Sequence, residues 1–212
     1  MNFAHLHVHT EYSLLDGSNK IKEYVGRVKE LGMNSAAITD HGVMYGVIDF
    51  YRAAKAAGIK PILGCEVYVA PNSRFDRELA GGEDRYYHLV LLAENNTGYA
   101  NLMKIVSKGF VEGYYYKPRV DKEVLRTYSE GIIALSACLA GEVQRYISKG
   151  LYDEAKNKAL EYEEIFGKGN YFLELQDHGI PEQAFVNQKL MQMSEELGIE
   201  LVATNDVHYT YA

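Results

Sequence analysis

The sequence has 212 residues, of which 47% are hydrophobic and 24% charged, a composition typical of a globular domain. We therefore expect residues 1–212 to form one domain. The formal net charge of −7 argues against a free-standing nucleic-acid binder of high affinity, because such proteins usually neutralise phosphates with a basic face. Bound divalent cations would invert the local potential, so a phosphate substrate is not excluded.

Neither a membrane span nor a targeting peptide is expected. No apolar run approaches the roughly 18 residues that a membrane-spanning helix needs, and the first predicted strand follows the first Met too closely to leave room for a targeting peptide. The two cysteines, Cys65 and Cys138, are too few for a disulfide framework and suit packing or metal ligation in a reducing compartment. We therefore expect a cytoplasmic protein with no membrane partner.

The first predicted strand, residues 3–10, carries three histidines. Side chains alternate along an extended chain, so His5, His7 and His9 share one face. Imidazole is the commonest metal ligand, and two imidazoles two residues apart can bind one ion. A lone His-x-His is equally compatible with ordinary histidines on a strand, so the prediction depends on other ligand types meeting it.

Two helices follow this strand. Ser18 is predicted to cap the first, whose apolar positions recur at helical spacing up to Gly32. The second is predicted to end at Gly58, because glycine commonly follows the last helical residue. Its predicted apolar face consists of Tyr45, Ile48, Tyr51 and Ala54.

Strands and helices continue to alternate along the chain. Strands are predicted at residues 35–38, 61–69, 87–93, 131–135, 171–175 and 201–203. Helices are predicted at residues 97–108, 121–127, 140–149, 152–166 and 181–197. Residues 71–85 and 113–119 are predicted to be loops.

This order predicts an α/β fold with seven strands. Helices in nearly every connection favour parallel strands with right-handed crossovers. A polar, ligand-type residue lies at or just beyond the end of nearly every strand, as in (β/α) barrels. An open doubly wound sheet would instead concentrate such residues at one switch point. We therefore expect a closed barrel.

Nine ligand-type residues should meet at that end of the barrel: His7, His9, Asp16, His41, Glu66, His88, Cys138, Asp206 and His208. At about four donors per zinc-like centre, the set suits two or three divalent ions. Such clusters act on phosphate esters, because the ions bind non-bridging oxygens, acidify a shared water and neutralise charge on the departing oxygen. Zn, Mn or Fe would fit the mixed ligands, and Cys138 favours a softer ion.

Three of these residues have a structural alternative. His88 begins its strand rather than ending it, so it could be a hydrogen-bonded core histidine. Cys138 could be a small buried hydrophobic residue. Asp16 could cap the helix that follows it.

Other residues are candidates for supporting roles. His5 and Asp40 are predicted to orient ligands from behind. His178 follows the one strand end that lacks a ligand, so it could contact substrate, donate a proton or be an ordinary surface histidine. Lys117 and Arg119, beside three consecutive tyrosines, could bind phosphates and stack bases or belong to an exposed loop.

Four motifs resemble those of the polymerase-and-histidinol-phosphatase (PHP) domain, in family order: His-Leu-His-Val-His-Thr-Glu-Tyr-Ser with Asp16-Gly17, Thr39-Asp40-His41-Gly42, Gly64-Cys65-Glu66, and Ala203-Thr204-Asn205-Asp206-Val207-His208-Tyr209. The similarity extends over the whole chain. It is greatest to the form found at the N-terminus of bacterial DNA polymerase III alpha subunits.

The resemblance implies a distorted seven-stranded (β/α) barrel with a trinuclear metal site. It assigns the first ion to His7, His9, Glu66 and Asp206, the second to Glu66, His88 and Cys138, and the third to Asp16, His41 and His208. In some relatives this site is a manganese- or zinc-dependent 3′→5′ exonuclease that proofreads. In others several ligands are replaced and the domain only supports the polymerase, whereas this sequence keeps every ligand position that can be matched.

The resemblance also implies a DNA 3′ end as substrate and the remainder of the alpha subunit as partner. Two alternatives stay open: a small-molecule phosphatase of the histidinol-phosphate type, and a scaffold whose metals only stabilise the fold. The chain ends shortly after His208. We therefore expect the C-terminal end of the natural domain and the polymerase body to lie outside this sequence, leaving the barrel incomplete there.

Overall fold

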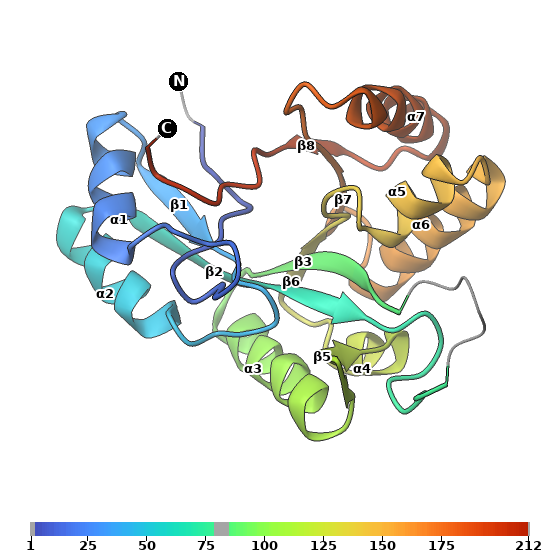
Figure 1. Cartoon of the computed structure of the whole chain (residues 1–212), viewed down its shortest axis with the longest axis horizontal. Coiled ribbons are helices and arrows are strands. Elements are labelled where there is room, and N and C mark those ends of the chain that lie inside the picture. The colour runs from blue at the N-terminus through green and yellow to red at the C-terminus, as the bar shows by residue number, and fades with distance from the viewer. Residues whose placement is uncertain (1–2, 79–84, 212) are drawn as a thin grey trace.

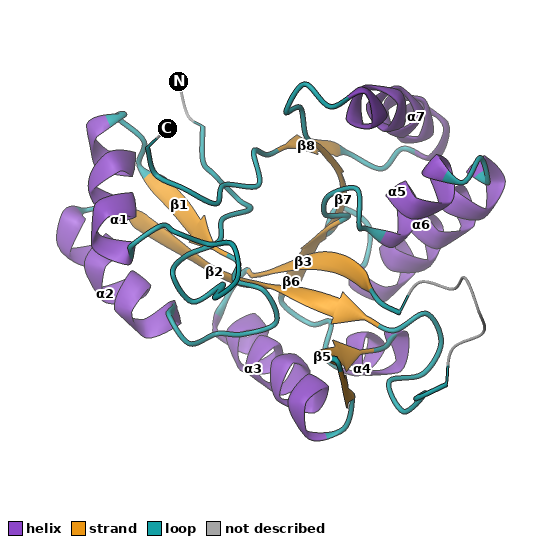
Figure 2. Ribbon diagram, in the orientation of Figure 1, coloured by secondary structure: helices purple, strands orange, loops and turns teal. Residues whose placement is uncertain are grey.

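The computed structural model describes residues 3–78 and 85–211, so residues 79–84 of the predicted loop 71–85 lie outside the described part. A curled sheet forms the inside of the molecule and helices cover its outer side (Figures 1 and 2). The helices are α1 (Ile21–Glu30), α2 (Val47–Ala57), α3 (Asn96–Val111), α4 (Lys122–Thr127), α5 (Glu142–Ser148), α6 (Tyr152–Phe166) and α7 (Pro181–Leu197). The strands are β1 (Ser35–Ile38), β2 (Lys60–Val69), β3 (Tyr87–Ala93), β4 (Tyr114–Tyr115), β5 (Lys117–Val120), β6 (Ile132–Leu135), β7 (Tyr171–Leu175) and β8 (Leu201–Ala203).

The sheet is mixed rather than parallel. Its order is β4-β5-β2-β3-β6-β7-β8, with β1 also paired to β2. The prediction of an all-parallel sheet was wrong for β3, which runs antiparallel to both β2 and β6. No helix lies between β2 and β3 in the described residues, and parallel neighbours need such a crossover. The start of β3 consequently lies beside the end of β2, where Tyr68 pairs with His88.

The N-terminal segment joins the two ends of the curled sheet. The predicted strand 3–10 is extended but forms only isolated bridges. On one side, the N–H of Ala37 in β1 donates to the carbonyl of His5 at 2.9 Å. On the other side, the N–H of His9 donates to the carbonyl of Val207, beyond β8, at 2.8 Å. These bonds bring the N-terminal histidines beside the segment that follows β8 (Figure 1).

The apolar core lies on both faces of the sheet. The larger part fills the space between the sheet and α3 to α7, around Leu91, Leu102 and Tyr162. Helices α1 and α2 pack on β1 through a second cluster that includes Phe50. A smaller cluster, around Val90, lines the inside of the curl. No helix in the described ranges combines the length and apolar character that a membrane crossing demands.

Two predictions about the first helices were wrong. The N-cap of α1 is Lys20, without a side-chain bond, whereas the hydroxyl of Ser18 donates to the carbonyl of His208 at 3.1 Å. Helix α2 does end at Gly58, but it buries Val47, Phe50 and Ala54. The helix thus buries a different face from the predicted one. Three residues of the predicted apolar face are exposed, namely Tyr45, Ile48 and Tyr51.

Candidate metal centre

All nine predicted ligand residues lie in one cluster at the end of the sheet where β2 finishes. They come from segments throughout the chain: the N-terminal segment (His7, His9), the loop after it (Asp16), the end of β1 (His41), β2 (Glu66), the start of β3 (His88), the turn after β6 (Cys138) and the segment after β8 (Asp206, His208). His88 begins its strand, yet it reaches the cluster because β3 is antiparallel to β2.

Glu66 lies at the centre of the cluster and is only 1% exposed. Its Oε1 is 2.9 Å from Nδ1 of His88 and 3.3 Å from Nε2 of His7. Its Oε2 is hydrogen-bonded to Nδ1 of His41 and lies 4.0 Å from Nε2 of His9. One carboxylate thus contacts four imidazoles, an arrangement that suits a ligand shared between ions.

Asp206 closes the cluster from the C-terminal side. Its Oδ1 is 3.1 Å from Nε2 of His9 and 3.3 Å from Nε2 of His7. It is also 3.6 Å from Nδ1 of His208. The backbone at Asp206 has a φ of 45°, a left-handed conformation that aspartate tolerates better than most residues. This local conformation helps to turn the carboxylate toward the two N-terminal histidines.

The outer ligands complete the cluster. Asp16 Oδ2 lies 3.2 Å from Nε2 of His41 and 3.8 Å from Nε2 of His208. The sulfur of Cys138 lies 3.7 Å from Nδ1 of His88. Each predicted ligand therefore approaches at least one other, and Asp16 faces histidines rather than capping α1.

The cluster contains buried polar atoms that make no hydrogen bond within residues 3–78 and 85–211. Nε2 of His7, Nε2 of His9 and Oδ1 of Asp206 are buried and have no hydrogen-bond partner among the described residues. Burying a polar atom without a partner costs free energy, and native structures rarely leave such atoms together. The ligand atoms of three sets lie within 4.8 Å of one another: His7, His9 and Glu66; His41, Glu66 and His88; His9, His41 and His208. Such imidazole and carboxylate donors fit divalent metal ions.

The charges of the cluster also favour binding of a cation. Burial would raise the pKa of Glu66, but His88, His41 and His7 hold it well below its usual value. Burial opposes ionisation of Asp206 as well, yet His7 and His9 lower the pKa of its carboxyl to about 2. Both buried carboxyls are therefore anionic at neutral pH. Burial lowers the pKa of His7, but Glu174 and Asp206 outweigh it and raise the pKa well above its usual value. The negative charges that favour a proton on His7 would equally favour a metal cation beside its ring.

Glu174, which the sequence analysis did not single out, fixes His7 from behind. Its Oε1 accepts from Nδ1 of His7 at 2.7 Å, and both side chains are buried. Gln176 Nε2 at 3.0 Å and the hydroxyl of Thr204 donate to the same oxygen. Glu174 thereby fixes the ring with Nε2 toward Glu66 and Asp206, where a cation could take the place of the Nε2 proton. The available signal was one charged residue in the otherwise uncharged strand Tyr-Phe-Leu-Glu-Leu.

Asp40, predicted to orient a ligand, reaches His9 through Ser13. The Ser13 hydroxyl donates to Oδ1 of Asp40 at 2.7 Å and lies 3.2 Å from Nδ1 of His9. Since that hydroxyl proton is used on Asp40, Ser13 accepts the proton of His9 Nδ1. Asp40 also accepts from the N–H of Thr10 at 2.6 Å, which anchors the turn. The Nε2 lone pair of His9 consequently faces the cluster.

His5 and His178 do not contact the cluster. The ring of His5 packs edge-on against Phe3, with a centroid distance of 5.0 Å. Nε2 of His178 donates to the carbonyl of Asn205 at 2.8 Å, and its Nδ1 accepts from Gln183 at 2.9 Å. Both ring nitrogens of His178 are thus used to connect the loops after β7 and β8. The predicted orienting role of His5 and proton-donor role of His178 gain no support from these contacts.

The predicted substrate contact of Arg119 was wrong. The residues predicted as a loop form the β4–β5 hairpin, in which Arg119 is 0% exposed. Its guanidinium donates to the main-chain carbonyls of Gly113 (3.3 Å), Arg74 (3.3 Å) and Asp76 (2.5 Å). Arg119 therefore joins the hairpin to the loop after β2 and is unavailable to substrate. Lys117 remains partly exposed, with its Nζ 5.2 Å from the Tyr68 ring centroid.

Comparison with known proteins agrees with this architecture. Residues 5–178 match the PHP domain family, so the chain belongs to that family. It is 51% identical over 209 residues to DNA polymerase III subunit alpha of Treponema pallidum, covering 99% of this chain and 18% of that protein. The same subunit of Borreliella burgdorferi is 48% identical over 207 residues, covering 98% of this chain and 18% of the relative. The chain thus spans less than a fifth of these curated relatives.

Solved structures share the fold at low sequence identity. A Bifidobacterium adolescentis protein assigned as a metal-dependent phosphoesterase is 17% identical, with a TM-score of 0.59, and the match covers 99% of this chain and 88% of that one. A Chromobacterium violaceum amidohydrolase is 15% identical, with a TM-score of 0.62, and the match covers 97% and 87%. The chain therefore has the α/β fold, with a curled, barrel-like sheet, of PHP-like phosphoesterases.

Proposed function

We propose that this chain is a metal-dependent phosphodiesterase that removes nucleotides from the 3′ end of DNA. The observation that carries the proposal is the cluster of nine ligand-type residues, in which the Nε2 atoms of His7 and His9 face Oδ1 of Asp206 without hydrogen-bond partners. The similar curated proteins are subunits of a DNA polymerase. A DNA polymerase holds the 3′ end of the growing strand, so the phosphodiester at that end is the substrate we propose. A 3′→5′ exonuclease at this site would therefore serve proofreading.

The ligand sets of the proposal are those that the resemblance implies, with two or three ions of zinc, manganese or iron. Such ions, when bound, supply Lewis-acid charge neutralisation and an activated water. The protein's own contribution is orientation. Glu174 and Ser13 hold the Nδ1 atoms of His7 and His9, so both Nε2 atoms face the cluster before any ligand arrives.

Cys138 takes part only when a cation is near. Burial, with Glu66 and Asp206 in support, raises the pKa of its thiol to about 12. The sulfur therefore stays protonated beside His88 at neutral pH. A nearby divalent cation would favour the thiolate, which is the form that binds metal.

The proposal extends to the partner and the compartment. The rest of a DNA polymerase III alpha subunit would be the partner, and the protein would work in the cytoplasm. The support is the near-complete coverage of this chain by the matched relatives.

The test is digestion of a single strand labelled at its 5′ end, with Mn²⁺ or Zn²⁺ and with chelator. We expect a ladder of strands shortened from the 3′ end, lost with chelator and reduced at least about a hundredfold in Asp206→Asn. The matched control is Asp153→Asn, whose carboxylate is 86% exposed on α6.

Three outcomes would contradict the proposal. Equal digestion by the wild type and Asp206→Asn would point to a contaminating nuclease. Turnover of a phosphate monoester without strand digestion would favour the small-molecule phosphatase. Metal-dependent stabilisation without any hydrolysis would favour the scaffold.

A further inference from the structure

A groove of about 470 Å³ opens directly beside the metal centre. Asp16, His41 and His88 belong to both, so anything in the groove is next to the candidate ions. Most of the remaining wall is aromatic, and it includes Tyr45 and Tyr114. The groove therefore extends the candidate metal centre with a mostly aromatic surface.

Three of its tyrosines are turned to solvent. Tyr45, which precedes α2, is 63% exposed, and Tyr114 and Tyr116 in the β4–β5 hairpin are 55% and 61% exposed. Tyr116 forms the tip of the hairpin with a φ of 61°, where glycine or asparagine would be the unstrained choice. None of the three rings fills the core, although Tyr114 packs near Phe110 and Tyr116 packs on Tyr115.

The charges of the groove suit a phosphate chain. Lys117 is the only lysine or arginine among the described residues that line it. The guanidinium of Arg85 lies over the ring of Tyr116, 4.5 Å from its centroid, and adds a second positive charge at the rim. A site for phosphate alone would need more cations and no exposed rings. Exposed rings beside a few cations are typical of surfaces that bind single-stranded nucleic acid by stacking.

We propose that Tyr45, Tyr114 and Tyr116 form a base-stacking subsite that holds a single strand as its end approaches the metal centre. The inference rests on the proposed function and adds the residues that select a nucleic acid over a simple phosphate ester. Stacking tolerates every base, so binding should depend on the presence of bases and not on their sequence.

The test compares two short strands with phosphorothioate linkages, which resist hydrolysis: an oligothymidylate and an abasic strand of equal length. Their affinities for the 212-residue chain are measured by fluorescence anisotropy in Mn²⁺. We expect the oligothymidylate to bind at least about fivefold more tightly, because each stacked base contributes about 1 kcal/mol or more. Tyr45→Leu and Tyr114→Leu should each lose about fivefold or more, and Tyr114→Phe should retain the affinity.

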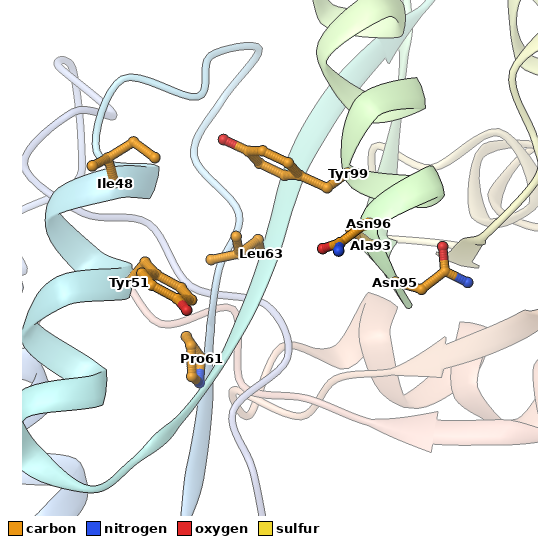
Figure 3. A pocket seen from close by; sticks show the side chains of 8 residues that line it. All are labelled: Ile48, Tyr51, Pro61, Leu63, Ala93, Asn95, Asn96 and Tyr99. Carbon is orange, nitrogen blue, oxygen red and sulfur yellow. The ribbon is translucent and has the colours of Figure 1, made fainter.

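The matched control is Tyr51→Leu. Tyr51 is 44% exposed but lines a separate cavity with Pro61, at the opposite end of β2 (Figure 3). Equal binding of both strands, absence of strand binding, or an equal loss in Tyr51→Leu would overturn the subsite. So would a groove that binds an apolar peptide and no strand. Base-dependent binding without 3′ digestion would keep the subsite and refute the exonuclease, so the two failures are distinguishable.

Discussion

Glu174 decides how His7 is presented to the metal centre. It accepts the Nδ1 proton of His7 inside the core, and Gln176 and Thr204 hold the carboxylate in turn. A carboxylate behind a metal-binding imidazole fixes the ring and raises its basicity. His7 thus owes its orientation to a residue outside every recognised motif.

Glu174→Gln should weaken metal binding without unfolding the protein. The amide can still accept from Nδ1, but its charge is lost, so we expect the affinity for Mn²⁺ or Zn²⁺ to fall about tenfold. Calorimetric titration measures this loss, with the exposed Glu164→Gln on α6 as control. Unchanged affinity in Glu174→Gln would show that His7 needs no carboxylate.

Leucine substitutions at Arg119 and Lys117 should have different effects on the free energy of unfolding. Arg119→Leu leaves the carbonyls of Arg74 and Asp76 without their donor and removes one of the two donors to the carbonyl of Gly113, so the free energy of unfolding should fall by about 3 kcal/mol. Lys117→Leu should change it by less than about 0.5 kcal/mol. Urea unfolding measures both values. A stable Arg119→Leu protein with impaired strand binding would restore the original prediction for this residue.

Glycines in two helices have opposite packing environments. A Cβ on Gly98, in the first turn of α3, would lie 1.8 Å from the carbonyl oxygen of Gly131 before β6. A Cβ on Gly26, exposed in α1, would meet nothing within 4 Å. Helix α3 can therefore pack this closely on the loop before β6 only because residue 98 has no side chain.

Alanine substitutions at these two glycines should change stability in opposite directions. Gly98→Ala should lower the free energy of unfolding by about 2 kcal/mol or more, because main-chain atoms must move. Gly26→Ala should raise it by about 0.5–1 kcal/mol. Thermal unfolding provides the comparison, and a destabilised Gly26→Ala variant would contradict the described environment of α1.

Most elements could be predicted from the sequence, but strand direction could not. Periodicity and capping residues located β1, β2 and β3 closely. They carry no information on whether a strand runs parallel or antiparallel to its neighbour. Reading β3 as parallel made His88 look misplaced, whereas its reversal brings His88 to Glu66. The hairpin that buries Arg119 was missed because its strands, Tyr-Tyr and Lys-Pro-Arg-Val, lack the apolar run that identified β1 and β8.

The sequence identified the candidate metal ligands but few of the residues around them. Histidines and acids in short motifs at strand ends identified residues that the structure brings together, such as His9 and Asp206. Residues that act through long-range contacts carry no such local pattern. Glu174 contacts a residue 167 positions away. Tyr45 was predicted to be in the core because its spacing fits a helical face that the fold leaves exposed.

Buried tyrosines make the whole molecule sensitive to alkaline pH. Burial raises the pKa of Tyr24, Tyr162 and Tyr171 above the usual 10.0. Above about pH 10 the unfolded chain therefore loses protons that the folded chain keeps, so stability falls as pH rises. The limiting slope is about 1.4 kcal/mol per pH unit for each tyrosine.

Urea unfolding across this pH range measures the slope. Tyr171→Phe should reduce it, because the hydroxyl of Tyr171 is buried with no partner in the described part of the chain. Tyr209→Phe, at a position 63% exposed, should not. Equal slopes in the wild type and Tyr171→Phe would show that Tyr171 ionises freely in the folded state.

The metal content of the chain tests the central claim most directly. Elemental analysis after equilibration with Mn²⁺ or Zn²⁺ and removal of free ions should give two or three ions per chain in the wild type. Glu66→Gln should bind fewer, because Glu66 contacts four of the cluster's histidines. Less than one ion per chain in the wild type, or equal content in Glu66→Gln, would contradict the account.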